Sequence, residues 1–149
     1  MISYARKIGL TKTIAFDPPI LRVEDRIRHY CREDKCGQYR KHRMCPPLVG
    51  TLTETRAWIR EYGRGILFQD VTELDVKNDR GGVEDTKRLF HEHILDIEHR
   101  MKHFGVSNPF GLIGGHCVLC EPYKAVRGDA CPFPDRARPS RPWKPWAWM

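Results

Sequence analysis

The sequence lacks the features that would direct it into a membrane. It contains no uninterrupted run of about 18 apolar residues, which is the length of a membrane-spanning helix. The first residues, Met1 to Lys7, do not supply the apolar core of a secretory signal. We therefore expect a cytoplasmic protein with no membrane partner. The composition, 40% hydrophobic and 30% charged, is typical of a folded globular chain rather than a disordered one.

The motifs of several common enzyme classes are also missing. There is no G-x-G-x-x-G, no phosphate-binding G-x4-G-K-[ST] loop and no G-x-S-x-G nucleophile elbow. Nucleotide-dependent and serine-hydrolase functions lose support. No cysteine is paired with an evident base either, so the sequence leaves open whether the protein is an enzyme.

Acidic residues are fewer than basic residues. With 26 Lys and Arg against 19 Asp and Glu, the formal net charge is +7. Such a charge raises nucleic acid or another polyanion as a partner.

Local patterns predict a small α/β domain. Thr51 and Glu54 have the spacing of a capping box, which predicts a helix from there to about Tyr62, ended by a left-handed Gly63. Residues 65–71 then indicate a mostly buried strand. A further strand is expected at about 20–23, after the turn-forming Asp17-Pro18-Pro19.

A second, longer helix is predicted at about 83–104. One apolar stripe runs along it, formed by Phe90, Ile94, Ile97, Met101 and Phe104. We expect the helix to stop at Gly105 and the stripe to pack on the sheet. Residues 111–115 indicate another buried strand, which leads to Cys117.

We therefore expect residues 1–149 to form a single metal-binding domain. Its fold class would be α/β, with α+β as the alternative: a small mixed sheet with packed helices and a cysteine-rich metal-binding edge. The Pro- and Trp-rich tail at about 139–149 cannot form a long regular helix, and we expect its tryptophans to pack on the domain.

The six cysteines fall into two blocks of three. The first block has the pattern C-x4-C-x8-C and the second C-x2-C-x10-C, with members Cys31, Cys36 and Cys45, and Cys117, Cys120 and Cys131. Thiols of a cytoplasmic protein stay reduced, so a disulfide framework is not expected. Their polar neighbours argue against a role as buried apolar residues. The first block shows little apolar periodicity and is predicted to be a loop.

Both blocks end in Cys-Pro, at Cys45-Pro46 and Cys131-Pro132, as bacterial ferredoxin runs do. The wide spacings also differ from the two short C-x2-4-C knuckles of many zinc sites. These features favour an iron–sulfur cluster, most simply 4Fe–4S, and leave zinc as the alternative. Because six thiolates exceed the four that one centre takes, some are spare or two centres share them.

The joint signatures resemble the predicted metal-binding proteins of domain of unknown function 2284. The first signature is Cys31-x4-Cys36-Gly37-x-Tyr39, leading to Met44-Cys45-Pro46-Pro47. The second runs from Gly115-x-Cys117-x-Leu119-Cys120 to Ala130-Cys131 and on to Arg138-Pro139-Ser140. The resemblance covers about 20–140 and implies metal binding, with iron–sulfur the more natural choice, without a settled reaction.

This chain departs from the family pattern at two positions. Glu121-Pro122-Tyr123 stands where members commonly carry a further cysteine, which removes a ligand. Arg141-Pro142-Trp143 replaces the usual Gly-Ile-Asp ending.

Histidines and basic residues offer further candidates. We expect the helical histidines, His91, His93, His99 and His103, to be solvated rather than ligands. His116 adjoins Cys117, and we expect it to support the centre rather than ligate it. Residues 40–43 and Arg136, Arg138 and Arg141 would surround a centre on which the two blocks converge.

The sequence thus predicts an iron–sulfur protein in electron transfer or an accessory redox role. Its partner would be a redox or accessory protein. The alternative is a basic binding module built on structural zinc, which would bind nucleic acid or a protein.

Overall fold

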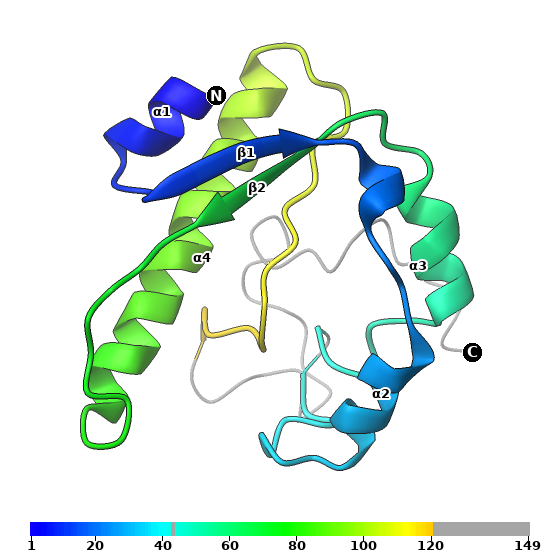
Figure 1. The fold of residues 1–149 in the computed structure, drawn as a ribbon, viewed down its shortest axis with the longest axis vertical. Helices are drawn as coiled ribbons and strands as arrows, with labels where there is room; N and C mark the ends of the chain where they lie inside the picture. The colour runs from blue at the N-terminus through cyan, green and yellow to red at the C-terminus, as the bar shows by residue number, and fades with distance from the viewer. Residues whose placement is uncertain (43, 121–149) are drawn as a thin grey trace.

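The computed structural model describes residues 1–42 and 44–120. Its elements, in chain order, are α1 (Ile2–Lys7), β1 (Lys12–Phe16), the 3-10 turn η1 (Pro18–Ile20), α2 (Asp25–Arg32), α3 (Leu52–Ile59), β2 (Gly65–Gln69) and α4 (Arg80–His103). The two strands pair antiparallel, with Ile14 opposite Leu67. The result is a small mixed α/β fold, as predicted, in which α4 lies behind the strand pair (Figure 1).

The long helix α4 follows the predicted pattern. Asp79 caps its first turn by accepting a hydrogen bond from the Gly82 amide at 2.8 Å. The chain leaves it through Gly105, whose φ of 83° is left-handed, so the predicted stop is confirmed. Ile94 and Ile97 of the apolar stripe are buried, but Phe104 is 75% exposed. It lies beyond the last helical residue and no longer follows the stripe.

The core is assembled from α1, α4 and the strands. Buried Ala5, Leu10 and Ile97 form its centre, and its partly buried surroundings include Phe68 of β2 and Phe90 of α4. The apolar stripe therefore packs on the sheet, as predicted.

Helix α1 was not predicted, because six residues carry too little periodicity to show a face. Polar contacts hold it to α4. The Tyr4 hydroxyl donates a hydrogen bond to Asp96, and the Arg100 guanidinium lies 3.8 Å from the Tyr4 ring centroid.

Two of the predicted strands are wrong. The N-terminal strand lies before the prolines, at β1, and residues 18–20 form η1 because Pro18 has a fixed φ and suits the first turn of a helix. Residues 111–115 form no strand. The Gly111 amide donates to Glu98 Oε2 of α4 at 3.2 Å instead of entering a ladder.

The shorter helix begins as predicted and ends early. Thr51 and Glu54 form both hydrogen bonds of the capping box. However, α3 stops at Ile59 instead of near Tyr62, and Gly63 does not adopt the left-handed conformation. The capping residue Arg60 keeps a right-handed φ of −66°, so the chain needs no glycine there.

The segment 105–120 runs between α4 on one side and α2 and α3 on the other (Figure 1). It therefore joins the strand-bearing half of the molecule to the half that carries the first cysteine block. No helix within the described residues is both long enough and apolar enough to cross a bilayer.

Candidate metal centre

The first cysteine block begins on a helix rather than in a loop. Cys31 lies in the last turn of α2, which corrects the prediction of a loop throughout this block. The signal for the helix was present, since Ile27, Tyr30 and Cys31 recur at spacings of three and four. Helix α2 is short and strongly charged, and none of its residues is buried.

After α2 the chain folds back through tight turns. Asp34 and Gly37 have left-handed φ values of 49° and 68°. The Asp34 carboxylate accepts from the Tyr39 amide at 2.8 Å, and the Arg40 amide donates to the Pro46 carbonyl at 3.0 Å. These bonds close the loop so that its two ends lie near each other.

The three thiols of this block influence one another. Burial raises the pKa of the Cys45 thiol, and repulsion from Cys36, Cys31 and Asp34 raises it further. The thiols therefore share one region of the loop. Negative groups gathered in this way repel when ionised, and a cation bound among them would relieve the repulsion.

The second block lies in irregular chain. Cys117 is 3% exposed and Cys120 is half-buried. Cys31, Cys36, Cys45 and Cys120 are free thiols, and Cys131 lies outside the described residues. Irregular chain leaves backbone amides available to donate to sulfur, as iron–sulfur sites require.

The two blocks meet through their histidines. His42, three residues before Cys45, packs its ring on His116, the neighbour of Cys117, with the centroids 4.8 Å apart. His42 is 7% exposed, and burial, with the charges of His116 and Lys41, lowers its pKa to about 4. Both segments therefore approach the same part of the molecule.

A third imidazole, that of His91, belongs to the same neighbourhood. It is only 3% exposed, so the prediction that it is solvated is wrong. Burial and the charge of His116 lower its pKa. This burial could not be predicted from the sequence, because His91 lies beside the apolar stripe and not within it. In contrast, His99 and His103 are exposed, as predicted, with ring centroids 4.5 Å apart.

The donors fit a soft metal or a cluster in their chemistry. Thiol sulfur is the ligand that zinc and iron–sulfur clusters share. Within residues 1–42 and 44–120, however, no group of three or more His, Cys, Asp or Glu side chains is arranged to hold a metal ion. The assignment of Cys31, Cys36, Cys45, Cys117, Cys120 and Cys131 as ligands thus stays a prediction.

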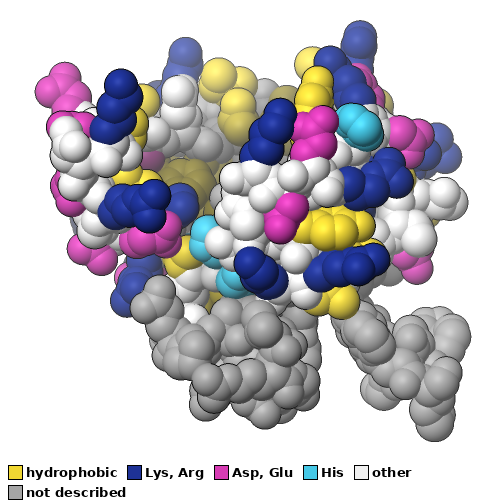
Figure 2. All heavy atoms as spheres, turned by 90° about the horizontal axis from the view of Figure 1, so that it is seen from below, with side chains coloured by type: hydrophobic (Ala, Val, Ile, Leu, Met, Phe, Trp, Pro, Cys, Tyr) yellow, Lys and Arg dark blue, Asp and Glu magenta, His cyan; other side chains and the backbone are white. Residues whose placement is uncertain are grey.

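Basic side chains do not form one continuous patch on the described surface of Figure 2. Lys and Arg are interspersed there with Asp and Glu. Arg40 and Lys41 are exposed beside the first block, while Arg136, Arg138 and Arg141 lie outside the described residues. This face offers no long basic stripe of the kind that follows a nucleic acid backbone.

The fold and this site define a small mixed α/β protein with cysteines in two segments that approach each other. The chain belongs to the family DUF2284, described as predicted metal-binding protein, whose family model matches residues 15–142. The resemblance read from the two cysteine signatures is thereby confirmed. Comparison with curated proteins and with solved structures finds no significant match.

Proposed function

We propose that the protein holds a 4Fe–4S cluster through its cysteines and serves in electron transfer or an accessory redox step. The ring contact of His42 with His116 carries the proposal, because it joins the neighbourhoods of Cys45 and Cys117. Thiols from distant parts of the chain can then serve one centre. The Cys-Pro endings and the wide cysteine spacing favour a cluster over zinc.

A bound cluster would supply one-electron redox chemistry. The chain would set its potential through hydrogen bonds to sulfur, through charge and through exposure. His42 and His116 are suited to the first role, since burial lowers the pKa of both rings and favours the neutral imidazole with one N–H donor.

The first block also offers an exposed edge for electron transfer to a partner. Cys36 is exposed, and so are Lys35, Arg40 and Lys41 around it. A partner must come close to this edge, and the positive side chains would attract an acidic protein face. We therefore propose an acidic redox protein as the partner.

Metal and acid-labile sulfide analysis of the full chain, purified without oxygen, tests this function together with a visible spectrum. Iron with matching sulfide and a broad brown absorbance is the expected result. Zinc without sulfide would overturn the cluster and support the alternative of a structural-zinc binding module. Nucleic acid affinity that falls steeply with salt would then point to a nucleic acid partner.

Substitution of the cysteines tests the ligand assignment. We expect Cys117→Ser and Cys120→Ser to abolish metal retention and to destabilise the fold. His93→Ala, a change on α4, is the matched control and should keep its metal. Full metal content in both cysteine variants would contradict the assignment.

A further inference from the structure

A cavity of about 340 Å³ lies between the end of β2, the first half of α4 and the segment that leads to Cys117. Its wall is formed by Phe68, Gln69, Asp70, Thr86, Lys87, Phe90, His91, Ile113, Gly114 and His116. None of these residues belongs to the cysteine blocks. The volume is near the lower end of about 300–1,000 Å³ that is typical of small-molecule sites, which favours a small ligand.

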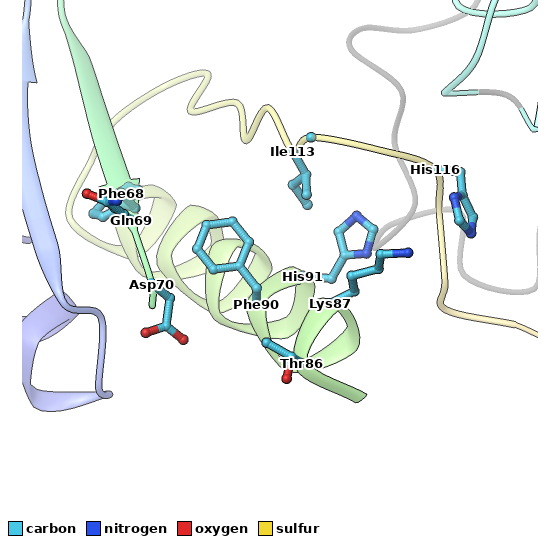
Figure 3. Close-up of a pocket in the computed structure, with 10 residues that line it drawn as sticks. Phe68, Gln69, Asp70, Thr86, Lys87, Phe90, His91, Ile113 and His116 are labelled. Atoms are coloured by element: carbon cyan, nitrogen blue, oxygen red, sulfur yellow. The ribbon is translucent and has the colours of Figure 1, made fainter. Parts of the chain in front are cut away.

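The cavity has an apolar middle and two different polar ends. Phe90 and Ile113 lie between Asp70 at the β2 end and the group formed by Lys87, His91 and His116 (Figure 3). An apolar wall with a few polar groups is the usual composition of a site for a small organic molecule.

At the basic end, Lys87 and His91 have hydrogen-bonding atoms that the contacts of the described residues do not use. The Lys87 ammonium lies 2.9 Å from Glu84 Oε1. This contact uses one of its three N–H donors. His91 is only 3% exposed, and its buried Nδ1 has no hydrogen-bond partner among the described residues. A buried polar atom without a partner is costly, so a ligand atom that bonded it would be favoured.

The acidic end is already held in place. Asp70 Oδ1 accepts from the Thr11 hydroxyl at 3.0 Å and from the Val71 amide at 2.9 Å. The apolar middle separates it from Lys87 (Figure 3). Asp70 is therefore not the partner of Lys87, which keeps two N–H donors beyond its contact with Glu84.

We propose that this cavity binds a small monocarboxylate with an apolar body, held by its carboxylate at Lys87 and His91 and by its body against Phe68, Phe90 and Ile113. A carboxylate accepts charge-assisted hydrogen bonds from an ammonium and from an imidazole N–H. Because His116 borders both this cavity and Cys117, the ligand would lie beside the cysteine segment. The inference does not depend on the metal that the cysteines bind.

Equilibrium dialysis of the full chain, metal included, against labelled phenylacetate tests the site. We expect saturable binding to one site, with an affinity at least about tenfold above that of the neutral phenylacetamide or of acetate. Equal affinity for the amide would overturn the proposal, because the charge would then not be recognised. Absence of saturable binding by phenylacetate would overturn it too.

Variants locate the binding site. Lys87→Met should weaken phenylacetate binding about tenfold, and Lys87→Arg should retain most of it. Lys102→Met is the matched control, because Lys102 also lies on α4 with its ammonium 2.9 Å from a glutamate but does not line the cavity. An equal loss in Lys102→Met would overturn the proposal in favour of nonspecific attraction to a basic protein.

Discussion

Gly111 is a point of close approach between the irregular segment 105–120 and α4. A Cβ at this position would lie 2.5 Å from Cγ2 of Ile94, which is itself only 5% exposed. The Gly111 amide also donates to Glu98 Oε2 of the same helix. The missing side chain therefore lets the backbone reach a buried helix face.

Gly111→Ala is expected to destabilise the protein by about 1–3 kcal/mol, because Ile94 sits in a packed core and cannot move away freely. Gly114→Ala is the control, since a Cβ there meets nothing within 4 Å. Urea unfolding of both variants measures the difference. Equal stability of the two would mean that the segment moves away from α4 at little cost.

The burial of His91 makes stability depend on pH. Burial and the charge of His116 lower the pKa of His91, so below about pH 6.5 the unfolded chain takes up a proton that the native ring resists. The group therefore stabilises the native state above the unfolded pKa, and this stabilisation is lost as the pH falls.

We expect the free energy of unfolding to decrease from pH 7 to pH 5, and His91→Gln to remove part of that decrease. The exposed His103 of the same helix gives the control, His103→Gln, which should keep the wild-type slope. Urea titrations at several pH values measure the slopes. If all three proteins share one slope, another group is responsible.

Helices with strong local signals could be predicted from the sequence. The capping box of α3 and the glycine after α4 can be recognised in the sequence, because capping depends on residues a few positions apart. The pairing of β1 with β2 could not be predicted in this way. Lys12 pairs with Gln69, which lies far away in the sequence, and a two-stranded pair carries little pattern of its own.

The stability of helix α3 depends on the hydrogen bonds of its first turn. The Thr51 hydroxyl accepts from the Glu54 amide at 3.2 Å, and the Thr51 amide donates to Glu54 Oε2 at 2.7 Å. The Thr51 amide and hydroxyl both donate to the Glu54 carboxylate, and these two bonds lower the pKa of Glu54. We expect Thr51→Ala to cost about 1 kcal/mol of stability and to fray α3.

Thr53→Ala is the control for this helix, because Thr53 is exposed in the same turn and caps nothing. Thermal unfolding followed by circular dichroism compares the two variants. If Thr51→Ala were as stable as Thr53→Ala, the capping box would contribute nothing measurable.

At the level of the whole chain, the candidate site was only partly predictable. Two cysteine blocks can be read from spacing, since ligands to one centre cluster locally. The contact of His42 with His116 arises from tertiary folding, so the spacing of residues in the sequence does not predict it. The burial of His91 is likewise set by what packs over α4.

The arrangement also separates the central core cluster from the first cysteine block. Ala5, Leu10 and Ile97 form the core with side chains from α1, α4 and β2, and none of them belongs to a cysteine block. The first block is held by turns and by α2, which has no buried residue. Such a region opens at a lower cost than a packed core does.

Removal of the metal should therefore loosen one part of the molecule. We expect a chelator, added without oxygen, to abolish amide-exchange protection at 31–50 and 113–120 and to leave most protection in β1, β2 and α4. The reason is that metal ligation would replace apolar packing as the stabilising interaction of the cysteine segments. Cys31→Ser, measured without chelator, should reproduce the pattern. Loss of protection throughout α4 would instead show that metal binding and core formation are one cooperative transition, as in small zinc domains.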